Sequence, residues 1–269
     1  MRNTRKSIFK IVFFVGVSSL TVSFLPSFQE QCCLSVINSS ACKHDSLYYP
    51  KIDSGEYVIH HQYYDLVYDE KHEQAKWVFY KLYPSYLNGP YKRRNDFRAD
   101  PKVISKSANH SDYRGSGYDR GHLMPAADMT WSEVALSESF YYSNMSPQHP
   151  SFNRGVWKRL ESKVRSWCME SDSLFVITGP VVNTIFDVIG QNRVAVPGAY
   201  FKVIMRFKQN KQEGIAFLLP NTSSKESLES YVYCIDSLEQ LVGIDFFHHQ
   251  NEESHRRLES SCSKVMWDW

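Results

Sequence analysis

The chain reads YDRGHLMPA over residues 118–126, and the expected fold class and chemistry both depend on this stretch. It ends a polar segment, 111–124, that contains three glycines and is typical of a loop or an irregular strand. With an ordinary pKa of about 6.5, His122 can take a proton from water near neutral pH. Most lone loop histidines are structural, but Asp119, Arg120 and a basic helix further along are the groups that a phosphate site needs.

Two downstream residues extend this group. Asn153 lies just before a helix predicted over 155–169, and Glu161 lies on that helix. An amide oxygen is a suitable ligand for Mg²⁺, which keeps most of its water, and a nearby carboxylate can hold a water. Structural alternatives stay open, because Asn153 could be a helix N-cap and Glu161 could pair with Arg165 at i+4. Arg165 would otherwise be a phosphate clamp.

The rest of the pattern predicts α+β architecture, because strands and helices mix without regular βαβ alternation. A hairpin is predicted from strands near Tyr57, over 63–68 and over 76–82, with a turn over 69–74. Helices are predicted over 132–142, 155–169, 224–233 and 237–242, and further strands over 174–178, 200–207 and 214–219. The strand 174–178 is expected to end at Gly179-Pro180.

The charge is unevenly distributed. The chain of 269 residues carries a formal net charge of +2, which becomes −2 without residues 1–27. Between Lys92 and Arg165, thirteen Lys and Arg face eight Asp and Glu, whereas the remainder after residue 27 sums to −7. This basic middle section is either an electrostatic footprint for phosphate or an ordinary solvated surface.

The N-terminus differs from the rest. Four basic residues precede an apolar run over 11–25, too short for a full bilayer span and typical of a signal peptide. We therefore predict a signal peptide or membrane anchor at 1–27, a linker at 28–55, a catalytic domain at 56–250 and a tail at 251–269. Export, periplasmic or secreted, is expected, with N-terminal membrane association if the segment is not cleaved.

The other candidate ligands carry less information. Six cysteines are present, with irregular spacing that excludes a CxxC zinc site, and their pairing stays open. Cys168 and Cys234 are read as buried thiols. The doublets His60-His61 and His248-His249 have no partners at metal-ligand spacing and are expected to be structural or solvated. The absence of GxSxG, P-loop and HExxH motifs removes several hydrolase classes.

At this point the sequence resembles a known family, the DNA/RNA non-specific endonucleases, a group that includes mitochondrial endonuclease G. The resemblance begins with 118–126 and continues in SNMSPQ (143–148), FNRGVW (152–157) and RLE (159–161). Further similar pieces are ITGP (177–180), YFKV (200–203), AFLLPN (216–221) and GIDFF (243–247). It covers residues 57 to about 247. Several motifs in the same order are more specific than any one alone.

The resemblance implies a His-Me finger fold, in which two strands and a helix hold one divalent ion, with antiparallel sheets flanked by helices. It implies His122 as the general base and Asn153 as the direct ligand of Mg²⁺, for which Mn²⁺ could substitute. Glu161 would orient a water on that ion.

The same resemblance implies that Arg120 and Arg165 meet phosphate charge and that Asn144 supports the base or the substrate. The family also has an upstream arginine that contacts phosphate. Arg93, Arg94 and Arg98 fall in that region, and Arg94 is our choice. DNA and RNA would be the substrates, a homodimer is expected only by analogy with the family, and mitochondrial import is the alternative to export.

Two other functions compete with a sugar-nonspecific endonuclease. A nucleic-acid-binding protein could keep the fold without catalysis, although intact His122, Asn153 and Glu161 argue against it. A phosphodiesterase for a non-nucleic substrate is the other alternative. Nothing in the sequence selects it.

Overall fold

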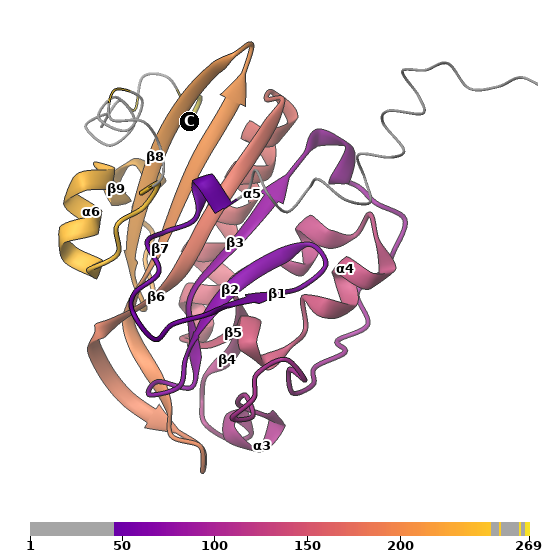
Figure 1. Cartoon of the computed structure of the whole chain (residues 1–269), viewed down its shortest axis with the longest axis vertical. Helices are drawn as coiled ribbons and strands as arrows, with labels where there is room; N and C mark the ends of the chain where they lie inside the picture. Colours follow the sequence, from indigo (N-terminus) through magenta and orange to yellow (C-terminus); the bar gives the residue numbers. More distant parts are fainter. Residues whose placement is uncertain (1–45, 249–252, 254–263, 265–266) are drawn as a thin grey trace, which may run out of the picture. The chain divides into compact units, whose positions relative to one another are not determined.

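Two antiparallel sheets and a few helices make up the computed structural model, which describes residues 46–248, 253, 264 and 267–269. The larger sheet has seven strands in the order β1-β2-β3-β6-β7-β8-β9, and the smaller pairs β4 with β5 (Figure 1). Every named strand pair is antiparallel. The α+β prediction is therefore confirmed.

The elements have the following bounds. The strands are β1 (Val58–His60), β2 (Tyr64–Asp69), β3 (Gln74–Leu82), β4 (Asp119–His122), β5 (Met145–Gln148), β6 (Ser173–Ile189), β7 (Val194–Lys208), β8 (Lys211–Pro220) and β9 (Val232–Tyr233). The α-helices are α3 (His110–Tyr113), α4 (Glu133–Glu138), α5 (Lys158–Met169) and α6 (Ile235–Val242). Short helical turns are η1 (Ser46–Tyr48), η2 (Pro84–Tyr86), η3 (Ala126–Met129), η4 (Tyr142–Asn144), η5 (Phe152–Trp157) and η6 (Leu228–Tyr231).

The predicted hairpin forms as β1, β2 and β3. Its turn is held by Asp69, whose Oδ1 accepts hydrogen bonds from the backbone of Lys71 (3.0 Å) and His72 (3.2 Å). A carboxylate that binds backbone two and three residues on is a common turn device, which explains why the charged segment 69–74 reverses the chain.

The strand predicted to end at Gly179-Pro180 continues to Ile189. β6 pairs with β3 only as far as Thr178, and beyond that point its other edge stays paired with β7, Pro180 lying opposite Tyr200. Proline is tolerated on a strand edge because its missing N–H is not needed for pairing there. Gly179-Pro180 therefore marks the end of the pairing between β6 and β3, not the end of β6.

The helix predicted over 224–233 is wrong. This segment forms η6 and the short strand β9, which pairs with Ala216 and Phe217 of β8. Pairing with an available sheet edge outweighs the weak local preference for helix. The helix predicted over 132–142 is shorter than expected, with Ser132 as the N-cap of α4, whereas α6 confirms the helix predicted at 237–242.

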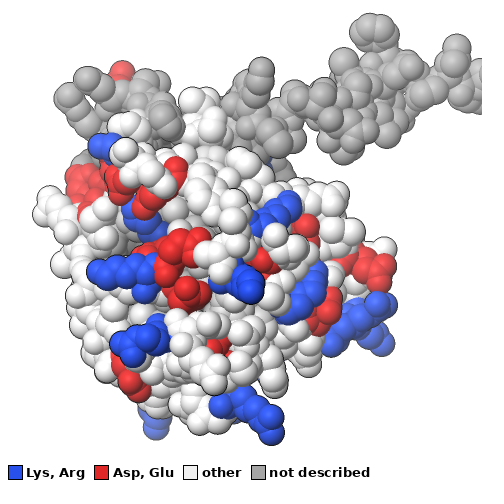
Figure 2. Space-filling model, turned by 60° about the horizontal axis from the view of Figure 1, so that its bottom comes forward, with Lys and Arg blue, Asp and Glu red and all other residues white. Residues whose placement is uncertain are grey.

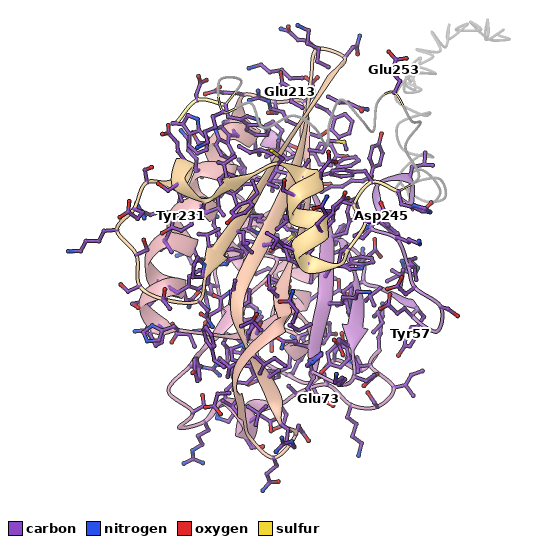
Figure 3. The ribbon with its side chains drawn as sticks, turned by 90° about the vertical axis from the view of Figure 1, so that its left-hand side faces the viewer. Tyr57, Glu73, Glu213, Tyr231, Asp245 and Glu253 are labelled. Atoms are coloured by element: carbon purple, nitrogen blue, oxygen red, sulfur yellow. The ribbon has the colours of Figure 1, made fainter. Side chains whose placement is uncertain are left out.

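Apolar side chains cover both faces of the larger sheet. On one face, Leu160, Val164 and Trp167 of α5 are buried in the same cluster as β3 and β6 residues, as their spacing of three or four predicts. On the other face, Ile235 and Leu238 of α6 pack with strand residues of β7. Figure 3 shows α6 lying across this face, with Asp245 just beyond it and Glu213 and Glu73 towards opposite ends of the sheet. Burying each such side chain contributes about 1.5–3 kcal/mol.

Part of the segment predicted as a linker, 28–55, contributes to this second cluster. Tyr49 is buried against Trp77 and Phe79, with ring centroids 5.8 and 5.0 Å away. Residues 1–45, which include the predicted signal peptide or anchor, lie outside the described residues. Within the described part of the chain, no helix is long and apolar enough to cross a bilayer.

The cysteines differ from one another. Cys168 is a free buried thiol, as predicted, whereas Cys234 is disulfide-bonded, so the reading of Cys234 as a thiol is wrong. Irregular spacing gave no signal for this bond.

Candidate active site

Strands β4 and β5 and helix α5 form the predicted ββα unit. The register pairs Asp119 with Gln148 and His122 with Met145, and the chain then passes through η5 into α5. Gly121 allows the close approach of Gln148 in this ladder, because a Cβ there would lie 2.1 Å from the Gln148 side chain, which would have to move. The unit therefore places His122 on a strand and Asn153 at the entry to the helix.

His122 is held in an apolar setting. Its side chain lies against the rings of Phe140 and Phe97, with centroids 5.0 and 5.9 Å away, and the residue is 8% exposed. Burial, with the nearby charges of Arg93 and Arg120, lowers the pKa of His122 to about 3. Nε2 is buried without a hydrogen-bond partner among the described residues. The imidazole is therefore neutral at physiological pH and has no proton to lose before it can accept one.

Asn153 is oriented by a carboxylate. Its Nδ2 donates to Oδ2 of Asp119 at 2.8 Å, and Arg154 donates to both oxygens of the same carboxylate at 2.8 and 2.6 Å. Burial raises the pKa of Asp119, but the hydrogen bonds from Arg154 and Asn153 outweigh this and lower it overall. Asp119 is thus an acceptor only, which fixes which end of the Asn153 amide faces it.

This arrangement fits a single hard divalent cation. With Nδ2 bound to Asp119, Oδ1 of Asn153 has no hydrogen bond from any residue that the structure describes. The described residues contain no cluster of three or more His, Cys, Asp or Glu that could hold a metal. One amide oxygen suits Mg²⁺, which retains several waters and takes few protein ligands.

A polar hollow of about 470 Å³ opens beside these groups. Arg93, Arg114, Arg120 and Arg154 line it together with Asn95, Phe97, His110, Tyr113, Tyr118, Asp119 and Asn153. The guanidinium of Arg120 lies 4.0 Å from the ring centre of Phe97. Four arginines face one carboxylate, and that carboxylate is already paired with Arg154. We call this hollow the arginine pocket, and its charge favours an anion.

Glu161 interacts electrostatically with the neighbouring charged residues Lys202, Asp128 and Arg165. Burial raises the pKa of Glu161 to about 7, although the charge of Lys202 opposes the rise. Lys202 is itself fully buried, 3.5 Å from the backbone oxygen of Leu123, and burial lowers its pKa to about 8. Asp128 accepts a hydrogen bond from Arg165 at 2.9 Å and another from Tyr80 at 3.2 Å. Arg165 is therefore already paired with a buried carboxylate.

Asn144 is fully buried and braces the main chain next to His122. Its Oδ1 accepts from the backbone of Met124 at 2.9 Å, and its Nδ2 donates to backbone oxygens of Met124 and Ser139 at 2.9 and 2.8 Å. Its backbone oxygen also accepts from Leu123. The whole amide is used to hold the backbone after His122 in place.

Of the upstream arginines, Arg93 rather than Arg94 lies at the arginine pocket. The side chain of Arg94 is 78% exposed, pairs with Glu133 at 3.0 Å and lines a different hollow. Arg93 lines the arginine pocket, lies 5.1 Å from the Phe140 ring centre and contributes to the lowered pKa of His122. The geometry therefore does not favour our choice of Arg94.

Three further residues at the site, Arg154, Asp128 and Lys202, are not among those that the sequence predicts to be functional. Arg154 stands next to Asn153 in the motif 152–157, but nothing in the sequence links it to Asp119. No sequence pattern indicates a role for Asp128. The position of Lys202 within the apolar run 200–205 does indicate one, because a lysine in such a run is expected to be buried, and buried lysines have partners.

Comparison with known proteins gives a consistent result. A family described as DNA/RNA non-specific endonuclease matches residues 46–253. Mitochondrial endonuclease G of Homo sapiens is 38% identical over 198 residues, covering 68% of this chain and 67% of that protein. Mitochondrial nuclease EXOG of Danio rerio is 33% identical over 199 residues, covering 68% of the chain and 58% of the relative.

Two further relatives extend the comparison. Nuclease C1 of Cunninghamella echinulata var. echinulata is 33% identical over 201 residues, covering 68% of this chain and 80% of that protein. A crystal structure of EndoG in complex with EndoGI matches with a TM-score of 0.71 and 31% identity, over 78% of this chain and 91% of that one. The likeness thus includes both sequence and fold.

Proposed function

This chain belongs to the family of DNA/RNA non-specific endonucleases, and we propose that it hydrolyses phosphodiester bonds in DNA and RNA with little preference for sequence. The observation that carries the proposal is an Asp119-oriented Asn153 in the lining of the arginine pocket, with a neutral His122 packed against Phe97 of the same lining. Hydrolysis of a phosphodiester needs a base, positive charge on the phosphate oxygens and an oriented water, and each has a candidate here.

His122 is the proposed general base. Its neutral ring can accept the proton of the attacking water. Asn144 supports this role indirectly, because its amide fixes the backbone of Met124 just after the base.

Asn153 is the proposed ligand of Mg²⁺, through Oδ1, with Mn²⁺ as a substitute. A divalent ion held there supplies positive charge to the phosphate oxygens and to the departing oxygen. Asp119 keeps Oδ1 turned outward by accepting from Nδ2. Glu161 in its ionised form accepts a hydrogen bond from a water in the site and so orients it.

The arginines would hold the phosphate. Arg93 and Arg120 line the arginine pocket from different segments, and guanidinium groups match phosphate in shape and charge. Arg165 would act indirectly, since it is paired with Asp128, whose charge acts on Glu161. Contacts to phosphate position a strand without reading bases, which accounts for the lack of sequence preference.

The test is an assay of plasmid DNA and of a long RNA, each with Mg²⁺ or with EDTA. Wild type should nick and then degrade both polymers with Mg²⁺ and neither in EDTA. His122→Ala should lower the rate by at least about 100-fold while DNA binding, measured in EDTA, is retained. The exposed His248→Ala is the matched control.

Other results would contradict parts of the proposal. Full activity in EDTA would exclude a role for a divalent metal ion in catalysis. Binding without cleavage under any divalent ion would favour a silent nucleic-acid-binding protein. Hydrolysis of a small chromogenic phosphodiester with no cleavage of either polymer would favour a phosphodiesterase for a non-nucleic substrate.

For location, we propose mitochondrial import rather than export. The support is that endonuclease G of Homo sapiens and EXOG of Danio rerio are both named as mitochondrial proteins. A fusion of residues 1–45 to a fluorescent protein, expressed in a eukaryotic cell, should colocalise with mitochondria. Secretion of the fusion would restore the export hypothesis.

A further inference from the structure

A second basic hollow lies beside the arginine pocket, on the outer side of α5. It measures about 420 Å³, and we call it the α5 groove. Its lining consists of Arg154, Gly155, Lys158, Arg159, Ser162, Lys163, Ser166 and Leu228. Four cations and two hydroxyls contribute to this lining and no carboxylate does, which is the composition expected of a surface that binds phosphates.

The groove adjoins the arginine pocket. Arg154 lines both hollows, and its guanidinium is paired with the carboxylate of Asp119 in the arginine pocket. A strand whose scissile phosphate lies in the arginine pocket therefore reaches the α5 groove by passing Arg154.

The helix arranges the groove residues in rows. Lys158, Ser162 and Ser166 follow one another at intervals of four, and Arg159 and Lys163 form the adjacent row at the same interval. From Lys158 to Ser166 the helix rises about 12 Å, the length of three to four base pairs of duplex DNA. Arg159 is fixed at the wall, because its Nη2 donates to the backbone oxygen of Glu226 at 2.7 Å.

The hollow on the opposite side of the loop 91–98 is different. It contains Lys92, Arg94 and Arg98, but also Asp96, Glu133 and Glu138. Arg94 pairs with Glu133 at 3.0 Å and Arg98 with Asp96 at 2.8 Å. On the face that Figure 2 turns forward, the bottom of the view in Figure 1, acidic and basic side chains are interspersed. A polyanion leaving the arginine pocket in this direction meets neutralised cations and unfavourable carboxylates.

We propose that the α5 groove binds the phosphate backbone of the nucleic acid on one side of the scissile bond, so that the substrate runs from the arginine pocket past Arg154 and along α5. The inference rests on the proposed function, because it assumes that the arginine pocket receives the phosphate that is cleaved. It assigns to Lys158 and Lys163 contacts that long substrates make and short ones cannot.

The test compares two double variants that lose the same charge. Lys158→Ala/Lys163→Ala removes two of the four groove cations, and Lys92→Ala/Lys211→Ala removes two lysines outside the groove. The substrates are a 30-base-pair duplex and thymidine 5′-p-nitrophenyl phosphate, whose single phosphodiester cannot extend to the groove. Duplex binding is also measured in EDTA over a range of salt concentrations by fluorescence anisotropy.

The groove variant should raise KM for the duplex by about tenfold, leave kcat within about twofold, and lower the salt slope of duplex binding by about two. Hydrolysis of the small substrate should not change. The control variant should remain within about twofold on the duplex. Circular dichroism melting curves should coincide, because neither lysine is buried.

Three outcomes would overturn the inference. Equal losses in both double variants would mean that net charge alone matters. Unchanged duplex constants in the groove variant would exclude a nucleic-acid contact and leave an acidic protein partner as the occupant. A loss on the small substrate as large as on the duplex would place the effect in catalysis. If wild type cleaves neither substrate, the proposed function fails, whereas the binding measurement in EDTA still decides on the groove.

Discussion

Asn153 donates a hydrogen bond from Nδ2 to Oδ2 of Asp119 at 2.8 Å, across 34 positions of sequence. The bond joins the strand of the ββα unit to the entry of its helix. Because an ionised carboxylate can only accept, the partner atom must be the amide nitrogen, and Oδ1 of Asn153 must face the other way. Asp119 thereby determines the orientation of the proposed metal ligand without binding the metal itself.

Asp119→Asn should loosen the orientation of the Asn153 amide. An amide at position 119 can donate as well as accept, so the Asn153 amide can turn and present its nitrogen to the site. We expect the Mg²⁺ concentration for half-maximal activity to rise by about tenfold, with kcat largely recovered at saturating Mg²⁺. A Mg²⁺ titration of plasmid cleavage measures this, and the exposed Asp187→Asn on β6 is the control. An unchanged titration would make the contact structural only.

Arg93→Ala and Arg94→Ala form a matched pair of adjacent variants. Arg93 lines the arginine pocket, whereas Arg94 is paired with Glu133 outside it. We expect Arg93→Ala to lower kcat/KM on duplex DNA by about 100-fold, and Arg94→Ala by less than about threefold. The reverse order, measured under identical salt, would restore Arg94 as the phosphate contact.

The adjacent positions of this pair also show where reasoning from sequence ends. Motifs in order are sufficient to predict the ββα unit, because the spacing from His122 to Asn153 and Glu161 is a property of the chain. Which of two neighbouring arginines faces the pocket depends on a one-residue register in the turn-rich loop 91–98, and that register is set by its packing on Phe140.

The role of Asp119 cannot be predicted from the sequence, for a related reason. Its partners, Asn153 and Arg154, follow it by 34 and 35 positions, and only the pairing of β4 with β5 brings them together. Local patterns likewise predicted a helix over 224–233, where the free edge of β8 instead selects the strand β9. Contacts between segments far apart in the sequence cannot be predicted from local sequence patterns.

Lys202 should control the pH at which Glu161 ionises. The buried ammonium stabilises the carboxylate and so opposes the rise of the Glu161 pKa to about 7. Replacing it by a neutral side chain of similar length, Lys202→Met, should raise that pKa further. The acid limb of kcat/KM should then move to higher pH by about one unit, because ionised Glu161 is needed to orient water.

A pH–rate profile from pH 5 to 9 on duplex DNA measures the effect of Lys202→Met. The half-buried Lys208→Met, at the end of β7, loses the same charge away from Glu161 and should leave the limb in place. His122 does not set this limb, since its pKa of about 3 keeps it neutral throughout the range. If the acid limb of Lys202→Met stays at the wild-type pH, ionisation of Glu161 does not determine the rate in this range.

A buried ion pair outside the site joins the segments around it. Nε2 of His61 lies 2.8 Å from Oδ2 of Asp100, both side chains are fully buried, and Ser143, next to Asn144, donates to the same carboxylate at 2.5 Å. Burial alone would lower the pKa of His61, but the hydrogen bond with Asp100 and the carboxylate of Glu138, 3.8 Å from Nδ1, raise it overall. The histidine therefore has the predicted structural role, and its raised pKa favours the charged form beside Asp100.

The raised pKa fixes the sign of the pH dependence. A histidine that binds its proton more tightly when folded adds stability that is complete below its unfolded pKa of about 6.5 and is lost as pH rises through the folded value. Asp100→Asn removes the counter-charge, so it should lower the free energy of unfolding by about 3 kcal/mol at pH 6 and by clearly less at pH 9. Urea unfolding at the two pH values measures both differences. His60→Asn, which breaks the exposed pair with Asp65, should cost less than about 1 kcal/mol at either pH. A cost for Asp100→Asn that is equal at pH 6 and pH 9 would mean that His61 is neutral in the folded protein.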